Sequence, residues 1–171
     1  MSIRVLLVED VKATHQLISE LIDFVGGFEV VGTCVTESNA LLWLHDHPGE
    51  ADLVILDLML REGSGFSVLA SAAREQAADV VVFSDFASPA VVRKCRSQGA
   101  LEAISKSDYR QLRVFLEKYR GRRAEASTHA ARPAKAEIQV RPQRTPTQAQ
   151  DPRPRGDDGD ESLTAARSSR P

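Results

Sequence analysis

Five polar residues each follow a short aliphatic run, at widely separated points of the 171-residue sequence. They are Glu9 and Asp10 after residues 3–8, Asp57 after 53–56, Ser84 after 80–83 and Lys106 after 101–104. The acid at position 57 is the most informative, because a carboxylate buried at the end of a strand is costly unless it is paired. Asp57 is therefore expected to be paired with a cation, bound to a metal or placed at the mouth of its strand.

These residue types favour phosphoryl chemistry if folding brings them together. Three carboxylates repel one another, and a hard divalent cation such as Mg²⁺ relieves that repulsion by binding oxygen ligands. The Ser84 hydroxyl and the Lys106 ammonium would then bind phosphoryl oxygens, leaving Asp57 as the in-line nucleophile of an acyl phosphate. Taken singly, the residues have plainer interpretations: the acidic pair can begin a helix, Ser84 can end a strand and Lys106 can be a solvated charge.

The elements that must position these residues alternate along the chain. Short aliphatic runs predict strands at 3–8, 28–35, 53–56, 80–83 and 101–104, and helical spacing of apolar residues follows each of them. Ser38, Ser88 and Ser107 are the expected N-caps of the second, fourth and fifth helices. Strict alternation of this kind predicts a doubly wound α/β fold, a parallel sheet covered by helices on both faces, with its ligand site at the carboxyl ends of the strands.

Composition divides the chain into two parts. All nine aromatic residues lie at or before Tyr119, whereas six of the eight prolines lie after Arg132. Residues 1–120 carry 12 Lys and Arg against 17 Asp and Glu, and residues 121–171 carry 10 against 7. We therefore predict a folded domain over 1–121 and a disordered, Pro- and Arg-rich tail over 122–171.

The same composition limits the location and the partners. No run of 18 apolar residues exists, no signal peptide is recognised, and Cys34 and Cys95 lack metal-ligand or disulfide-scaffold spacing. These features predict a cytoplasmic protein with reduced thiols and no membrane contact. Nucleic-acid binding is not expected, and would be confined to the tail if it occurred, because the basic tail has no aromatic residue to stack on bases.

At this point the sequence resembles the receiver domain of the response regulators of two-component signalling. The resemblance rests on "VED", "ILDL", "VFS" and "SKS", in this order and at strand ends, and covers about residues 3–120. It implies a CheY-like, flavodoxin-like (βα)5 fold with strand order 2-1-3-4-5. It also implies a phosphoacceptor at Asp57, Mg²⁺ held by Glu9, Asp10, Asp57 and the Met59 carbonyl, and phosphoryl oxygens bound by Ser84 and Lys106.

The expected function is that of a stand-alone response regulator in a phosphorelay. By the resemblance, a sensor histidine kinase or phosphotransfer protein supplies the phosphoryl group, and signalling proceeds through an unidentified protein partner that binds the fourth helix, fifth strand and fifth helix, about Ser88 to Arg120. A homodimer through that face is compatible with the pattern. The protein is not expected to be an enzyme beyond accepting a phosphoryl group on itself and slowly releasing it.

Two departures from the family pattern keep an alternative open. The aromatic switch residue that receivers usually carry three positions before the lysine is Ala103, and the normally small residue after the hydroxyl residue is Asp85. The alternative is a receiver-shaped interaction module that binds partners without phosphorylation. A haloacid-dehalogenase-type phosphatase is excluded because its second Asp would stand at Met59, and a flavin carrier is excluded because the loop after the first strand is acidic.

Overall fold

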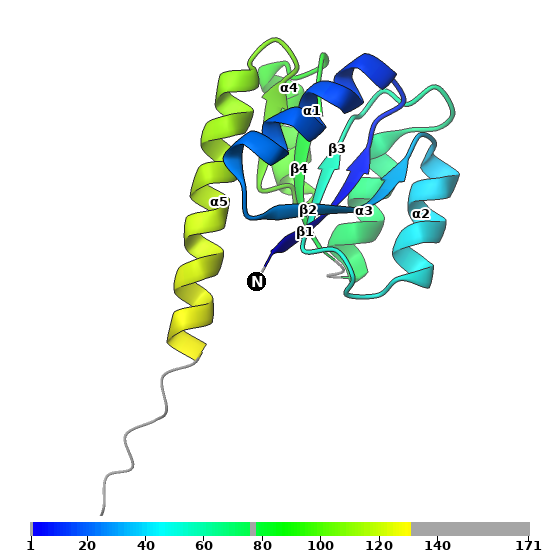
Figure 1. The fold of residues 1–171 in the computed structure, drawn as a ribbon. Coiled ribbons are helices and arrows are strands. Elements are labelled where there is room, and N and C mark those ends of the chain that lie inside the picture. The colour runs from blue at the N-terminus through cyan, green and yellow to red at the C-terminus, as the bar shows by residue number, and fades with distance from the viewer. Residues whose placement is uncertain (1, 76–77, 131–171) are drawn as a thin grey trace, which may run out of the picture. The chain divides into compact units, whose positions relative to one another are not determined.

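Five strands alternate with five helices in the computed structural model, which describes residues 2–75 and 78–130 (Figure 1). The strands are β1 (Ile3–Val8), β2 (Phe28–Cys34), β3 (Leu53–Leu56), β4 (Asp79–Ser84) and β5 (Glu102–Ser105). The helices are α1 (Lys12–Val25), α2 (Glu37–Asp46), α3 (Gly65–Glu75), α4 (Pro89–Ser97) and α5 (Tyr109–Ala130). These strands confirm the five that the aliphatic runs predict, each within two residues at its ends.

The strands form one parallel sheet in the order β2-β1-β3-β4-β5. This is the flavodoxin-like order, so the predicted fold class is confirmed. The direction of strand order reverses between β1 and β3, because the chain moves outward to β2 and then returns across β1. In such sheets the ligand crevice opens beside this reversal, at the carboxyl ends of the strands.

Two apolar layers cover the sheet, as its near-continuous hydrophobic strands require. Alternate strand residues such as Val54 and Leu56 pack against α2, α3 and α4, whereas Leu53 and Ile55 pack against α1 and α5. All four of these side chains are at most 1% exposed. A sheet buried on both faces leaves its strand ends as the place where polar groups can reach solvent.

The helix ends follow local capping chemistry, with two corrections to the predicted caps. Ser88 caps α4, as predicted, and its Oγ accepts a hydrogen bond from the Val91 N–H at 3.4 Å. The N-cap of α2 is Thr36 rather than Ser38, because the chain leaves β2 at Cys34 and turns into the helix two residues earlier. Asp108 rather than Ser107 takes this role at the start of α5, since its Oδ1 accepts from the Gln111 N–H at 2.9 Å.

Helix α5 continues to Ala130, past the boundary predicted at residue 121. Arg120 donates hydrogen bonds to the carbonyl oxygens of Val25 and Gly26, and Arg123 forms an ion pair with Asp52. These contacts hold the helix against the body as far as Arg123, which composition does not reveal. The predicted disorder of the tail from residue 131 onward falls outside the described residues. In the part of the chain that the structure describes, no helix combines the length and apolar character needed to span a bilayer.

Candidate functional site

Folding brings the residues after β1, β3 and β5 into direct contact. The Lys106 Nζ lies 2.7 Å from Asp57 Oδ2 and 2.7 Å from Glu9 Oε2. Glu9 is 2% exposed and Asp57 4% exposed, and only 10% of the Lys106 side chain is accessible. Asp57, directly after the third strand, is therefore paired with a cation at the mouth of the sheet.

The local backbone fixes the orientation of both carboxylates. Glu9 Oε1 accepts a hydrogen bond from the Val11 N–H at 2.9 Å, and Asp57 Oδ1 accepts one from the Met59 N–H at 3.1 Å. In each case the carboxylate bonds to the amide two residues later, which is the turn that an acid favours at a strand end. One oxygen of each acid is thus held by the backbone, and the other faces Lys106.

Burial and charge act in opposite directions on the ionisable groups. Burial raises the pKa of Glu9, and the Lys106 ammonium and the Val11 amide offset this only in part. Burial alone would lower the pKa of Lys106, but its hydrogen bond with Asp57 and its close charge contacts with Asp57 and Glu9 outweigh that effect and raise it. Lys106 therefore stays protonated around neutral pH, and its charge compensates the buried acids.

The third acid, Asp10, completes a set of oxygen ligands. Glu9, Asp10 and Asp57 each offer a carboxylate oxygen within 4.8 Å of the others. Within residues 2–75 and 78–130, the buried Glu9 Oε2 has no hydrogen-bond partner of good geometry, although it is close to Lys106. An all-oxygen, acidic set with one such oxygen fits a hard divalent cation such as Mg²⁺. This acidic triad can therefore hold a metal.

The remaining predicted residues lie on the neighbouring strands. Ser84 is fully buried at the end of β4, its Oγ accepts a hydrogen bond from the Phe86 N–H at 3.4 Å, and its carbonyl oxygen accepts one from the Lys106 N–H at 3.2 Å. Ala103 is 5% exposed on β5 and packs in the layer under α2, α3 and α4. Asp85 is exposed. Met59, two residues after Asp57, is 55% exposed.

Three further residues around this site were missed by sequence reasoning. The Arg61 Nε lies 3.7 Å from Asp10 Oδ2, on a side chain that is 78% exposed. Tyr109 packs edge-on against Phe83, with 5.1 Å between ring centroids, and the charge of Lys106 acts on its hydroxyl. Glu37 reaches the loop after Asp57 from α2. No motif marks these residues, because each is defined by a contact between distant segments.

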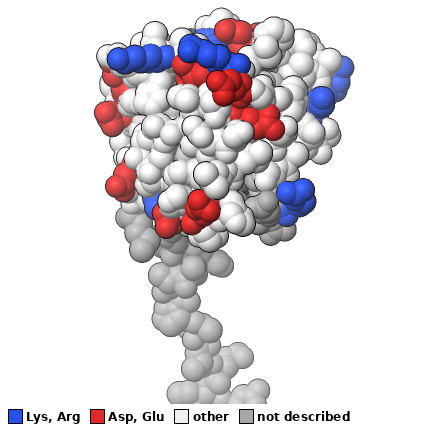
Figure 2. Space-filling model, turned by 90° about the vertical axis from the view of Figure 1, so that its right-hand side faces the viewer, with Lys and Arg blue, Asp and Glu red and all other residues white. Residues whose placement is uncertain are grey.

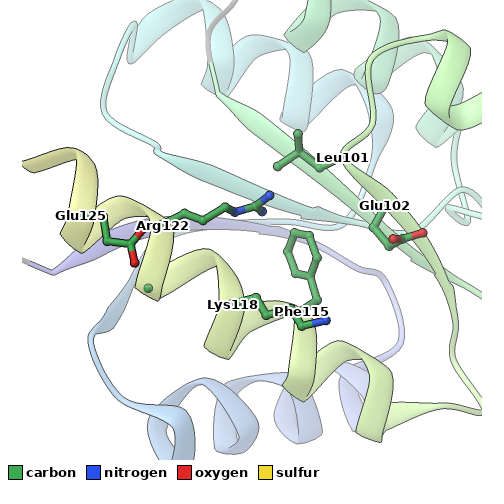
Figure 3. Close-up of a pocket in the computed structure, with 7 residues that line it drawn as sticks. Leu101, Glu102, Phe115, Lys118, Arg122 and Glu125 are labelled. Carbon is green, nitrogen blue, oxygen red and sulfur yellow. The ribbon is translucent and has the colours of Figure 1, made fainter.

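One face of the molecule carries both signs of charge along its upper edge. Figure 2 shows acidic and basic side chains next to one another along the top of the molecule, above a largely uncharged face. A separate pocket of about 420 Å³ lies between the start of β5 and the middle of α5 (Figure 3). Its lining combines the apolar side chains of Leu101 and Phe115 with the charged groups of Glu102, Lys118, Arg122 and Glu125.

A family model and a curated protein resemble this chain. Residues 5–117 match the model of a family described as "Response regulator receiver domain". A curated relative, the transcriptional regulatory protein MalR of Bacillus subtilis, is 29% identical over 129 residues, which cover 74% of this chain and 54% of that protein. The chain thus spans about half the length of this relative.

Solved structures share the fold. The receiver domain of Thermotoga maritima CheB is 20% identical with a TM-score of 0.63, over 71% of this chain and 96% of that one. A chain of the CheX–CheY–BeF3–Mg²⁺ complex of Borrelia burgdorferi is 23% identical with a TM-score of 0.56, and the match covers 60% of this chain and 77% of that chain. At such identities the likeness is one of fold alone.

Proposed function

The chain belongs to the response regulator receiver domain family, and from this premise we propose that it accepts a phosphoryl group on Asp57 from a histidine kinase or phosphotransfer protein. The observation that carries the proposal is the 2.7 Å contact between Lys106 Nζ and the buried Asp57 carboxylate, beside two further acids. A lone structural ion pair would not need the neighbouring Glu9 and Asp10.

The proposed reaction is a direct transfer between donor and acceptor. An oxygen of Asp57 attacks the phosphorus atom, the phosphorus–nitrogen bond of the donor phosphohistidine breaks, and its electron pair stays on the imidazole nitrogen. Glu9, Asp10, Asp57 and the Met59 carbonyl would hold Mg²⁺, which supplies charge neutralisation for the phosphoryl oxygens. Support for the metal comes from the acidic triad, and from the CheY-containing complex with BeF3 and Mg²⁺ among the similar structures.

Lys106 and Ser84 have separate roles in this proposal. Once Asp57 is phosphorylated, the Lys106 ammonium pairs with a phosphoryl oxygen in place of the carboxylate oxygen that it contacts now. The Ser84 hydroxyl, at the end of the neighbouring strand, donates to another phosphoryl oxygen. The position of Ser84 is supported by the hydrogen bond from the Lys106 backbone N–H to the Ser84 carbonyl oxygen, which ties the ends of β4 and β5 together.

The output we propose is phosphorylation-dependent binding to a protein partner. The surface formed by α4, β5 and α5, which we call the partner face (Ser88–Arg120), includes Lys106, and its strand β5 lies next to β4, which ends at Ser84. The pocket of Figure 3 borders this face and joins apolar side chains to charges of both signs, a composition suited to a protein partner or a second copy. The mixed charge in Figure 2 gives no support to nucleic-acid binding on that side of the molecule.

A second candidate is the interaction module that works without phosphorylation. Ala103 favours it, because the buried methyl group of this residue cannot make the inward ring movement of an aromatic switch. The exposed carboxylate of Asp85 also favours it, because it repels an incoming phosphoryl dianion.

Mg²⁺-dependent labelling decides between the two candidates. We expect the purified chain to gain one phosphoryl group from phosphoramidate or a kinase, detected by intact-protein mass spectrometry, only when Mg²⁺ is present. Asp57→Asn should not be labelled, and an Asp46→Asn control, altered at an exposed acid on α2, should label like the wild type. A folded protein that gains no phosphoryl group from either donor would refute the proposal and leave the interaction module.

A second measurement addresses the output. Beryllofluoride with Mg²⁺ should change the hydrogen exchange of amides in the partner face of the wild type, and leave Asp57→Asn unchanged. If exchange changed only around Asp57 and not beyond Ser88, phosphorylation would not reach the proposed partner face.

A further inference from the structure

The loop between β3 and α3, residues 57–64, carries the groups that follow the proposed phosphoacceptor. Its first part is held from inside the domain: the Met59 N–H donates to Asp57 Oδ1 at 3.1 Å, and Leu60 is 7% exposed in the core. Its end is held by the Gly65 N–H, which donates to the Leu58 carbonyl oxygen at 3.1 Å. Residues 61–63, in between, are exposed.

Glu37 holds this exposed part from outside the loop. Glu37 Oε2 accepts a hydrogen bond from the Ser64 N–H at 2.6 Å, and the Glu37 N–H donates to the Glu62 carbonyl oxygen at 3.0 Å. One residue thus contacts the loop through its side chain and through its backbone. The first contact is charge-assisted, and bonds of that kind are about twice as strong as neutral ones.

The shape of the loop is built for this contact. Gly63 has φ +90, a conformation that residues with a side chain rarely adopt. A Cβ at position 63 would lie 2.3 Å from the Glu37 Cβ and 2.3 Å from its Oε2, where there is no room for it. The glycine therefore lets the first turn of α2 approach the loop closely.

Glu37 is itself fixed by the start of its helix. It is the first residue of α2, and the preceding Thr36 caps the helix by accepting a hydrogen bond from the Asn39 N–H at 3.2 Å. Helices α2 and α3 pack on the same face of the sheet. Glu37 therefore connects the loop to a helix rather than to another loop. We call its two hydrogen bonds to the loop the clamp.

We propose that Glu37 is a positioning residue of the phosphorylation site, which holds the β3–α3 loop so that the Met59 carbonyl and Arg61 keep fixed places beside the metal-binding acids. The inference rests on the proposed function, because the Met59 carbonyl is a proposed Mg²⁺ ligand. Glu37 lies outside the acidic triad itself and acts through the loop. Groups that hydrogen-bond directly to metal ligands change metal affinity by about tenfold to hundredfold when they are removed, and for Glu37, which acts through the loop, we expect the lower end of that range.

The test compares three variants. Glu37→Ala removes the acceptor, Glu37→Gln keeps a neutral acceptor without the charge, and Glu62→Ala removes a negative charge from an exposed position of the same loop. In the metal-free protein, hydrogen exchange of the Ser64 amide should become about tenfold to hundredfold faster in Glu37→Ala, the factor that corresponds to losing a charge-assisted hydrogen bond. Mg²⁺ affinity, measured by calorimetry, should fall about tenfold in Glu37→Ala and less than threefold in the other two.

The outcomes separate positioning from charge and from the proposed function. Equal losses of Mg²⁺ affinity in all three variants would show that only the charge matters and would overturn the inference. Unchanged Mg²⁺ affinity in Glu37→Ala, with or without faster Ser64 exchange, would overturn it as well. If the wild type bound no Mg²⁺, the proposed function would fail, and unchanged Ser64 exchange in Glu37→Ala would then refute the clamp independently.

Discussion

The ion pairing of Lys106 leads to a prediction about stability that needs no phosphodonor. Replacing Lys106 by Met keeps most of the volume of the side chain and removes its charge. Glu9 and Asp57 would then face each other at the buried end of the sheet without a cation. We expect Lys106→Met to lower the free energy of unfolding by about 3–5 kcal/mol at pH 7, in the absence of divalent cations.

The magnitude follows from the distances and the burial. At an effective dielectric constant of about 20, two opposite unit charges separated by the observed 2.7 Å attract by about 6 kcal/mol, and Lys106 forms two such contacts. Removing the three charged groups from water costs several kcal/mol for each, so most of this attraction is offset. The net loss is expected because the variant keeps the desolvation cost of the two acids and loses the compensating cation.

The loss of unfolding free energy in Lys106→Met is expected to depend on pH. Burial already raises the pKa of Glu9, and loss of the Lys106 ammonium raises it further. A group whose pKa is raised on folding adds stability below its unfolded pKa, and this contribution is lost as the pH rises through the folded value. The deficit of Lys106→Met should therefore shrink as the pH falls from 7 to 5, because Glu9 takes up a proton more readily in the folded variant than in the unfolded chain.

Urea denaturation followed by circular dichroism at the two pH values is the assay. Lys118→Met, which removes an exposed lysine from α5, is the matched control and should change stability by less than about 0.5 kcal/mol. A loss below about 1 kcal/mol in Lys106→Met, or a deficit that does not vary with pH, would refute the account of Lys106 as the compensating charge.

Three further predictions concern single side chains or glycines. Asp85→Ala should be labelled about twofold to fivefold faster by acetyl phosphate at low salt, since an exposed like charge costs up to about 1 kcal/mol, and equal rates would contradict this role. Burial alone would raise the pKa of Asp52, but its hydrogen bonds with Arg4 keep it low; in urea unfolding, Asp52→Asn should cost about 1–2 kcal/mol at pH 7. That deficit should shrink below about pH 4, as the wild-type carboxylate becomes protonated, and a constant deficit would argue against the ion pair. Gly65→Ala should lose about 2 kcal/mol or more in thermal unfolding, because its Cβ would lie 2.1 Å from a backbone oxygen, whereas Gly121→Ala in open space should be neutral or stabilising; equal effects would contradict the close approach.

Local chemistry was predictable only where one signal dominated. The Ser88-Pro89 pair combines a cap with a residue that fits the first turn, and it marks the start of α4 correctly. Ser38 and Ser107 each stand close to another capping residue, Thr36 or Asp108, and the sequence does not show which of them the chain uses. The choice depends on where the preceding strand leaves the sheet, which is a property of the packed domain.

The sequence by itself determined the order of elements and the edge where the site forms. Aliphatic runs of strand length are a local signal, and parallel strands place all their carboxyl ends on one edge, so Glu9, Asp57 and Lys106 had to come near one another. Only the tertiary structure decided that Lys106 contacts both acids, and that Glu37 binds the Ser64 amide. Such contacts join segments that are far apart in the chain, and their geometry is fixed by how helices and loops pack on the sheet rather than by any periodicity in the sequence.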